Sequence, residues 1–512
     1  MRGPHNIWRL IRTGATFERT GAMKVALDAA DAPARLRVAA RILGWPFAWL
    51  GYKGDPALPP VTRAITALGP AYVKFGQILS TRPDVVGVEL ADQLSMLQDR
   101  LPPFSQDQAR RTLRAELGQP VEALFDAFSE PVAAASIAQV HRARRADNGR
   151  EVAVKVLRPG IESAFRRDID AFHFAAGMIE RLSPATRRLR PRDVVAHFES
   201  VVTGELDLRL EAASASEFAE NTRGDEGMKV PRPHWHLSAR RVLTTDWAEG
   251  TPLGDIAALR AAGHDLPKLG ERVLQLFLCH ALRDGYFHAD MHQGNLKVAR
   301  DGDVVIYDFG IMGEIDEYTR RVYAEILMGF IRRDYDRVAR VHFEAGYVPP
   351  DRDIKEFSRA LRAVGEPIFG ADASQISMAN LLAYLFEVTE RFGMATRTEL
   401  ILLQRTMVVV EGVARSLDPQ INMWQVARPV VESYIRDNLG PRAATRDLAR
   451  AAQVLGRFAP LLPEFLERRM PELLREPAAP PPPPRRGRGL AVGMALGAVA
   501  ALAGTALGAF LG

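Results

Sequence analysis

The sequence predicts an α+β protein with two lobes, a helical extension before them, a helical region after them and a C-terminal transmembrane helix. Two pairs of short apolar runs flank the turn dipeptides Asn148-Gly149 and Asp301-Gly302, a pattern typical of β-hairpins. Long stretches around these hairpins repeat apolar residues every three or four positions, as helices with one buried face do. The last stretch, 489–512, contains no charged residue.

Each element follows from the local pattern. The first hairpin pairs 137–144 with 151–157, and the second pairs 296–298 with 304–307. A short strand is expected at 242–245, and a buried helix runs from Gly270 to Gly285, where the glycine suits a helix C-cap. Helical periodicity covers three further regions: 56–128, 191–222 and 318–474.

At 512 residues the chain exceeds the size at which a single hydrophobic core keeps growing. The changes of pattern predict six parts, namely an N-terminal segment, a helical extension, a strand-rich lobe, a helical lobe with the region after it, a Pro/Arg linker and an anchor: 1–55, 56–130, 131–247, 248–476, 477–488 and 489–512.

The composition excludes some classes of function. The formal net charge is only +5, and no basic run is interleaved with stacking aromatics, so we expect no nucleic-acid partner. The single cysteine, Cys279, excludes an internal disulfide. Eight of the 67 basic residues are lysines, so each lysine is a candidate for a site that needs a compact charge, although arginine-rich codon usage explains the imbalance equally well.

Both ends of the chain suggest contact with a membrane. The N-terminal segment carries arginines around Trp8, which fits either an ordinary amphipathic helix or a helix on a membrane surface. Near the other end, Pro480–Pro484 forms a stiff spacer before Arg485, Arg486 and Arg488. Leu490–Leu511 then gives an apolar helix of about 33 Å, the thickness of a bilayer core.

Arginines just before this segment predict a tail-anchored protein whose body lies on the cytoplasmic face of the membrane, the inner membrane if the chain is bacterial. The tail also contains the small-residue pairs Gly493-x-x-x-Gly497 and Gly504-x-x-x-Gly508. Such pairs are typical of close helix–helix contact and would support a homodimer, but an Ala/Gly-rich segment also contains them by chance.

The strongest chemical signal lies around the second hairpin. Asp290 is followed five residues later by Asn295, and after the hairpin Asp308 begins an Asp-Phe-Gly sequence. This order and spacing reproduce the phosphoryl-transfer loop of kinases. Asn295 and Asp308 would supply oxygen ligands to a Mg²⁺ ion on the ATP phosphates, and Asp290 would orient the attacking hydroxyl or water. The fold class is therefore predicted to be protein-kinase-like.

A second kinase-like signal lies on the first hairpin. Val152-Ala-Val-Lys155 is a strand that ends in a lysine suited to pair with phosphate oxygens. Kinases carry a glycine-rich loop before this strand, but here the corresponding stretch runs from Pro131 through Ala133, Ala134, Ala135 and Ser136 to Val140. Alanines stiffen such a loop and move its backbone away from the phosphates, so ordinary protein kinase activity is in doubt.

These residues, with three further motifs, resemble the UbiB-like (AarF/UbiB) family of atypical kinases. Lys74-Phe-Gly76-Gln77 looks like the family's Lys-x-Gly-Gln signature, the Ala133–Ser136 run looks like its alanine-rich loop, and Glu205-Leu-Asp207 looks like its Glu-x-Asp motif. The match runs from about residue 60 to 330. Met291 and Gln293 depart from the prolines usual in the family, which should alter the stiffness of that loop more than its chemistry.

The resemblance implies that the N-terminal extension folds over the active site. Lys74 and Gln77 would lie where ordinary kinases bind a protein substrate, held by Glu205 or Asp207. Glu211 is the candidate partner of Lys155, and Glu205 is the alternative. On an unbroken helix Glu205 and Asp207 lie about 200° apart, so the acids cannot all point one way. The resemblance also places the adenine-binding hinge at Asp246-Trp247.

The resemblance implies an ATP- and Mg²⁺-dependent kinase or ATPase that supports isoprenoid quinone (ubiquinone) biosynthesis. Its partners would be membrane lipids or quinone precursors and the enzymes of that pathway. Two alternatives stay open: a small-molecule phosphotransferase of the aminoglycoside/choline kinase type, whose Asp…Asn loop is similar, and a non-enzymatic scaffold that changes shape with bound nucleotide. Phosphotransferases of the aminoglycoside/choline kinase type lack the Lys-x-Gly-Gln and alanine-rich motifs that this chain carries. A scaffold that only changes shape has no evident need for a complete set of Mg²⁺ ligands.

Overall fold

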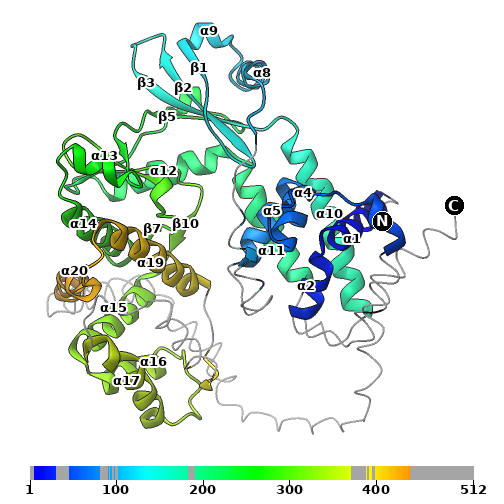
Figure 1. Ribbon diagram of the computed structural model, residues 1–512. Helices are drawn as coiled ribbons and strands as arrows, with labels where there is room; N and C mark the ends of the chain where they lie inside the picture. The colour runs from blue at the N-terminus through cyan, green and yellow to red at the C-terminus, as the bar shows by residue number, and fades with distance from the viewer. Residues whose placement is uncertain are drawn as a thin grey trace, which may run out of the picture. The chain divides into compact units, whose positions relative to one another are not determined.

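The structure of the protein is a computed structural model (Figure 1) that describes residues 5–29, 45–80, 102–182, 191–370, 391–394 and 398–438, with the single positions 38, 90, 93, 94, 97 and 388. These residues form two compact units. The first unit comprises Met1–Ala212 and Pro233–Trp247, and the second comprises Ala213–Arg232 and Ala248–Pro483. Each unit has its own hydrophobic core.

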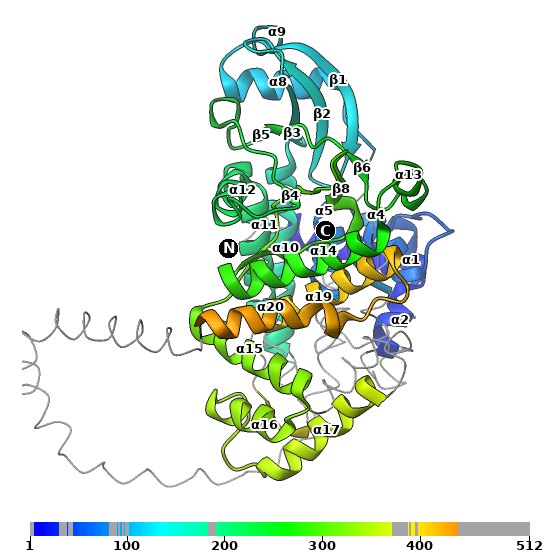
Figure 2. The same ribbon diagram turned by 90° about the vertical axis from the view of Figure 1, so that its left-hand side faces the viewer.

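A four-stranded antiparallel sheet forms one end of the first unit, in the order β1-β2-β3-β5 (Figure 2). Its strands are β1 (Phe125–Ala134), β2 (Ala138–Arg145), β3 (Glu151–Leu157) and β5 (Val242–Asp246). Apolar residues of β3 alternate inward and pack with the helices α8 (Gln106–Leu117) and α9 (Val121–Leu124). The prediction of the first hairpin is confirmed, and Gly149 takes the positive φ of 69° that its turn requires.

Helices make up the rest of the first unit. They are α1 (His5–Thr20), α2 (Ala22–Ala29), the 3₁₀ turn η1 (Trp45–Leu50), α4 (Pro60–Leu68), α5 (Pro70–Ser80), α10 (Ile161–Leu182), α11 (Pro191–Glu205) and α12 (Leu208–Asn221), the last of which continues into the second unit. A cluster of aromatic side chains joins them, in which Phe75 stacks on Phe172 at 5.0 Å and meets Phe198 edge-on at 5.0 Å. This core anchors the extension to α10 and α11.

The second unit is mainly helical around two small sheets. The sheet β4-β9-β8-β6 contains the second hairpin, and β10 pairs with β7. The elements of the second unit are β4 (Met228–Lys229), β6 (Thr251–Pro252), α13 (Ile256–Ala261), α14 (Leu266–Cys279), the π-helical turn η4 (His280–Asp284), β7 (Tyr286–His288), η5 (Gln293–Asn295), β8 (Leu296–Val298), β9 (Val304–Ile306) and β10 (Met312–Glu314). The short 3₁₀ turn η3 (Trp235–Leu237), between β4 and β5 in the sequence, belongs to the first unit. The predicted end of the buried helix is confirmed, because Gly285 caps it with φ 70°.

The described residues after β10 form the helices α15 (Glu317–Arg332), α16 (Tyr335–Glu344), α17 (Ile354–Gly370), α19 (Thr398–Leu417) and α20 (Met423–Asn438). α19 and α20 pack on α14, and their apolar residues share its core, whereas α16 and α17 form a smaller core of their own. The predicted C-terminal helical region is therefore confirmed for the described residues of 317–370 and 398–438.

Two sequence predictions about local structure were wrong. Helix was expected up to residue 128, but β1 begins at Phe125. This strand is irregular, with register shifts at three places, and it contains Pro131 at the edge of the sheet, so its sequence lacks the regular alternation of a strand. The helix predicted over 191–222 is broken after Glu205, and a new helix starts at Leu208.

The predicted transmembrane helix is also corrected. Among the helices of the described residues, none combines the length and the apolar character needed to cross a bilayer. The longest ones carry several charges; α19, for example, contains Glu399, Arg405, Glu411 and Arg415. The residues on which the anchor was predicted, 489–512, lie outside the described part of the chain. The observed fold is thus a two-unit α+β fold with a helical extension and a helical C-terminal region.

Candidate nucleotide-binding and catalytic site

Lys155 and Glu211 form a close ion pair in the first unit. Lys155 sits on the central strand β3 between Val140 of β2 and Leu243 of β5. Its Nζ atom donates to both carboxylate oxygens of Glu211, each at 2.9 Å, from the first turn of α12. The side chains are 18% and 11% exposed, so both charges are shielded from water and each needs the other.

A second shielded pair joins the extension to α11. The Nζ atom of Lys74 on α5 lies 2.6 Å from the Oε1 atom of Glu205, and the two side chains are 14% and 10% exposed. Asp207 is engaged elsewhere, since Arg209 donates to it at 2.8 and 2.6 Å and this bonding lowers the pKa of the Asp207 carboxyl. The break between α11 and α12 lets Glu205 and Glu211 serve different lysines.

Gly76 of the Lys-x-Gly-Gln motif has a packing role. A Cβ atom at this position would lie 2.5 Å from Leu97 and 3.3 Å from both Ile65 and Leu94. A larger residue here would push these terminal methyl groups aside, so Gly76 allows α5 to pack closely against them. The motif therefore combines one charged residue, Lys74, with one that favours close packing.

One arginine, Arg158, holds the backbone of the alanine-rich turn through hydrogen bonds. Ala133 and Ala134 end β1, and the Ala135 N–H donates to the Ala138 carbonyl at 2.8 Å. Arg158 donates to the carbonyls of Ala135 and Ser136, both at 3.2 Å, and its own N–H donates to the Ile137 carbonyl at 2.8 Å. Ser136 is buried. These bonds fix the backbone of the turn without any glycine.

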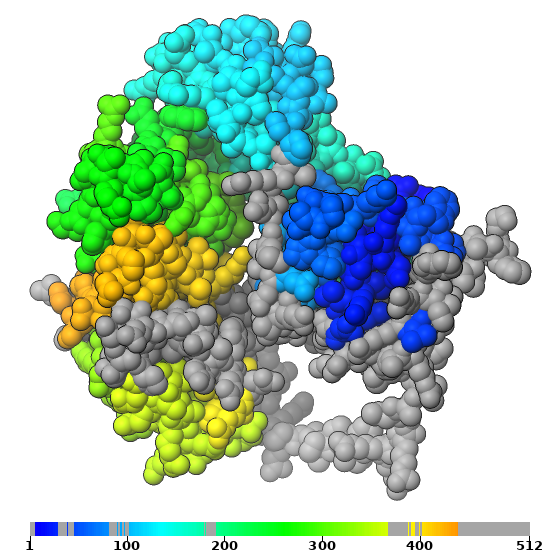
Figure 3. Space-filling view, viewed as in Figure 1, coloured from blue at the N-terminus to red at the C-terminus, as the bar shows by residue number. Residues whose placement is uncertain are grey.

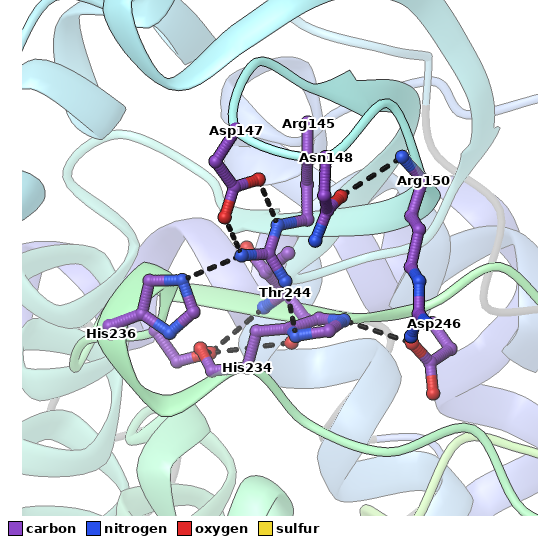
Figure 4. Close-up of polar contacts among 9 residues, drawn as sticks. Arg145, Asp147, Asn148, Arg150, His234, His236, Thr244 and Asp246 are labelled. Carbon is purple, nitrogen blue, oxygen red and sulfur yellow. Dashed lines mark hydrogen bonds and ion pairs between the residues drawn. The ribbon is translucent and has the colours of Figure 1, made fainter.

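The predicted hinge is braced on the side of the first hairpin (Figure 4). The Asp246 carboxylate lies 3.0 Å from Nε2 of His234, and Arg145 donates to Nδ1 of the same imidazole at 3.0 Å. Arg145 is in turn held by Asp147 at 2.9 Å. Because Nδ1 accepts from an arginine, the ring proton sits on Nε2 and is donated to Asp246.

The neighbouring hinge residue, Trp247, is also engaged. Its N–H donates to the Glu151 carbonyl at 3.2 Å, which extends the pairing of β5 with β3. Its ring is covered by the Arg142 guanidinium at 5.0 Å. The backbone N–H of Trp247 is thus already bonded within the sheet.

In the second unit, His288 ties the Asp290 loop to the Asp-Phe-Gly segment. Its Nδ1 accepts the Asp290 N–H at 3.1 Å, so its proton is on Nε2, which lies 2.9 Å from the Asp308 carbonyl oxygen. The imidazole is fully buried, and burial lowers its pKa, which keeps it neutral in the form that makes both bonds. Phe309 packs edge-on against the same ring at 5.4 Å.

Asn295 and Asp308 each carry a side-chain oxygen of the type that ligates a hard cation. The Asn295 amide Nδ2 donates to the Asp290 carbonyl at 3.0 Å, so Oδ1 is the atom suited to ligate a cation. Asp308 is exposed and has a φ of 66°, a strained conformation for a residue other than glycine. A neutral amide oxygen and a carboxylate oxygen fit the preference of Mg²⁺ for hard oxygen ligands. The Asp290 side chain is 38% exposed and reaches solvent.

α19 supports this loop, a contact that the sequence motifs did not predict. The buried Thr406 hydroxyl lies 3.0 Å from the Ala289 carbonyl and 2.8 Å from the Leu402 carbonyl of its own helix, so these two acceptors share its one proton. Gln293 donates to Ser416 at 2.7 Å. Desolvation lowers the pKa of Arg405, and the charge of Asp290 opposes that shift. A polar Gln-Arg-Thr run inside an otherwise apolar helical stretch was the available signal.

Lys297, which follows Asn295 closely in the sequence, has a structural role. It donates to the Ala248 carbonyl at 2.8 Å and lies 5.5 Å from the ring centre of Tyr307. The structure therefore groups the predicted residues in two sets: Lys74, Lys155 and Glu211 with the alanine-rich turn and the hinge in the first unit, and Asp290, Asn295 and Asp308 in the second.

Comparisons with known proteins identify the family of the chain. Residues 96–342 match the model of the ABC1 atypical kinase-like domain, and residues 361–422 match that of the UbiB helical domain. The chain is 41% identical over 408 residues to a probable protein kinase UbiB of Aeromonas hydrophila, covering 79% of this chain and 75% of the relative. It is 41% identical over 437 residues to a protein of the same description from Edwardsiella ictaluri, covering 84% and 80%.

Among solved structures, the complex of Rv3197 with erythromycin from Mycobacterium tuberculosis is similar, with 26% identity, a TM-score of 0.44 and coverage of 68% of this chain and 92% of that one. The two UbiB relatives are similar over most of their length and carry the identification. The chain belongs to the UbiB family of atypical kinases.

Proposed function

We propose that this protein binds Mg-ATP and catalyses phosphoryl transfer or ATP hydrolysis in support of isoprenoid quinone (ubiquinone) biosynthesis. The observation that carries the proposal is the loop of Asp290, Asn295 and Asp308, which the buried His288 and the hydroxyl of Thr406 hold in place. The substrate class follows from the family to which the chain belongs.

Each residue has a separate task in this proposal. Lys155 carries a fixed positive charge, aligned by Glu211, for the phosphate oxygens. Asn295 and Asp308 would hold the Mg²⁺ ion, which neutralises charge that develops on the phosphates when it is bound. Asp290 orients the acceptor hydroxyl or a water molecule and takes up its proton.

Family membership favours the atypical kinase or ATPase over the small-molecule phosphotransferase. An aminoglycoside/choline kinase type of phosphotransferase shares the Asp…Asn loop, but the match to the UbiB helical domain over 361–422 adds a region that supports that loop through α19. We therefore retain the atypical kinase or ATPase as the proposed function.

The test is a comparison of metal-dependent nucleotide binding in matched variants. Asp308→Asn and Asn295→Ala each remove a charge or an oxygen ligand, and we expect Mg-ATP affinity to fall at least about tenfold in titration calorimetry, with turnover reduced further. Asp301→Asn is the control, because Asp301 is an exposed aspartate of the same hairpin that pairs with Lys229. Unchanged affinity and turnover in both site variants would contradict the proposal.

The substrate class needs its own measurement. ATP turnover of the full chain is followed with and without isoprenoid quinone precursors in vesicles, and with a generic protein substrate. Stimulation by the precursors alone supports a role in quinone biosynthesis. Phosphorylation of the protein substrate without any response to precursors would favour an ordinary protein kinase.

A further inference from the structure

The first unit presents a cluster of exposed aromatic side chains that its core does not use. Trp8 on α1, Trp49 on η1 and Tyr52 just after η1 are 48%, 72% and 43% exposed. Ile7, beside Trp8, is also exposed. Leaving such large apolar groups in water costs free energy, and a group of them on one surface usually marks an interface. We call these four residues the aromatic face.

The aromatic face is built as one surface. The Arg12 guanidinium lies 5.7 Å from the ring centre of Trp8 and 5.5 Å from that of Tyr52, and it donates to the Tyr52 hydroxyl at 3.1 Å. Arg19 donates to the carbonyls of Trp49 and Gly51 at 3.1 and 2.6 Å. Arg12, about one turn after Trp8 on α1, thus contacts two of the rings, and Arg19, about two turns after Arg12, holds the backbone that carries the third.

The backbone beneath the face is fixed. The Tyr52 N–H donates to the Thr16 hydroxyl at 3.1 Å, and a Cβ atom at Gly51 would lie 2.3 Å from the Ala15 carbonyl oxygen. This close approach clamps η1 and Tyr52 onto α1, whose dark-blue segment reaches the surface in Figure 3. A shallow hollow of about 460 Å³ lies beside Trp49, lined also by Arg19, Pro46 and Ala48. The rings are thus held outward by a rigid support.

The charges of the face indicate what covers it. α1 and η1 together carry the cations Arg9, Arg12 and Arg19 and the single acid Glu18. Arg9 is held by Asp168, whereas the half-buried Arg12 places its guanidinium over the rings of Trp8 and Tyr52. Tryptophan, tyrosine and arginine side by side are the residues that occupy the boundary between lipid headgroups and acyl chains.

We propose that the aromatic face docks on the surface of an anionic lipid bilayer, without crossing it. Trp8, Trp49 and Tyr52 enter the headgroup region, and Arg12 and Arg19 lie at the level of the lipid phosphates. The occupant is a lipid surface rather than a protein groove, because the face combines outward rings with an excess of cations and only a shallow hollow. This contact would place the protein at the source of an apolar substrate.

The experiment measures binding of the full chain to vesicles by flotation. The vesicles contain phosphatidylcholine alone or with about one third phosphatidylglycerol, and salt is raised from low to high. We expect binding to the anionic vesicles that weakens with salt, and a loss of at least about tenfold in the partition coefficient for the double variant Trp8→Ser/Trp49→Ser. Arg12→Gln should reduce binding to anionic vesicles only.

Matched controls come from the same unit. Trp235→Ser removes a tryptophan that is 52% exposed on η3, and Arg111→Gln removes an exposed arginine on α8. Neither control should change vesicle binding. Thermal unfolding of every variant checks that the fold is kept. We expect unchanged unfolding temperatures, because the substituted side chains lie at the surface.

Three results would overturn the proposal. The first is that the unaltered chain does not float with anionic vesicles. The second is that the double variant floats as well as its control, which places any lipid contact elsewhere in the chain. The third is that the double variant keeps its lipid binding but changes the molar mass measured by light scattering, which assigns the face to contact between two copies of the chain.

Discussion

The Nζ atom of Lys155 is equidistant from the two carboxylate oxygens of Glu211, at 2.9 Å each, so the pair aligns the lysine on its strand without committing it to one oxygen. In kinases the corresponding lysine–glutamate pair must be in place for phosphoryl transfer. Here the pair forms within one unit and is shielded from water, so it belongs to the stability of that unit as well as to its chemistry.

The Lys155–Glu211 pair should show strong coupling. Glu211→Gln leaves the Lys155 charge without its counterion, and we expect it to lower the free energy of unfolding by roughly 2–3 kcal/mol, somewhat less than for a fully buried pair. Lys155→Met together with Glu211→Gln should cost less than the sum of the single variants. Denaturant unfolding of a double-mutant cycle measures this.

The control cycle is the exposed pair Arg142–Glu151, whose side chains are 48% and 40% exposed on neighbouring strands. Its coupling should stay below about 1 kcal/mol. Equal coupling in the two cycles would contradict the structural role given to Lys155 and Glu211.

Lys74 should behave unlike a surface lysine. Removing it by Lys74→Ala leaves the Glu205 carboxylate without its cation at a position only 10% exposed, which should cost more than about 1 kcal/mol of stability. ATP turnover should change as well if the extension covers the nucleotide. The comparison is Lys53→Ala, an exposed lysine expected to change stability by less than about 0.5 kcal/mol. Identical thermal stability and turnover in the two variants would show that Lys74 has no role in the site.

Thr406 should support catalysis from outside the reacting groups. Thr406→Val removes the hydroxyl bonded to the Ala289 carbonyl and leaves that carbonyl buried without its donor, at a cost of about 1–2 kcal/mol. We expect kcat to fall while the KM for ATP stays close to that of the parent, because the Asp290 loop loses its position but its ligands remain.

Thr203→Val is a suitable comparison for Thr406→Val. The Thr203 hydroxyl makes a similar bond to the Glu199 carbonyl at 2.7 Å, but on an exposed helix face. This variant should keep the parent's kcat. A Thr406→Val protein with normal kcat would show that α19 does not hold the catalytic loop.

Buried histidines should make the protein less stable in acid. Burial lowers the pKa of His342, whose Nδ1 bonds the Val338 carbonyl at 2.8 Å, below its ordinary value of 6.5. Below that value the unfolded chain binds a proton that the folded chain does not, so stability falls as the pH falls. The slope attributable to one such group is at most about 1.4 kcal/mol per pH unit.

His342→Leu replaces this imidazole with an apolar side chain that does not titrate. The free energy of unfolding of the variant, measured between pH 7 and pH 5, should vary less steeply than that of the parent. The same slope in both proteins would show that His342 does not remain neutral in the folded state. His288 has the same sign of shift, so the parent's slope contains both contributions.

The sequence by itself determined the two hairpins, the buried helix that ends at Gly285 and the motif around Asp290. Each rests on interactions between residues close in the chain: an Asn-Gly or Asp-Gly turn sets the pairing of its own strands, and Gly285 caps its own helix. The identification as an atypical kinase followed from such local motifs in their order.

Only the tertiary structure decided which acid serves which lysine. The sequence left Glu205 and Asp207 as alternatives for Lys74, because a continuous helix would point them in different directions. The break between α11 and α12 and the capture of Asp207 by Arg209 assign Glu205 to Lys74 and leave Glu211 for Lys155. The partners are 131 and 56 positions apart (205 − 74 and 211 − 155), and no local pattern encodes such distant contacts. The same holds for Thr406 and the Ala289 carbonyl, which meet only because α19 packs on α14 in the folded core.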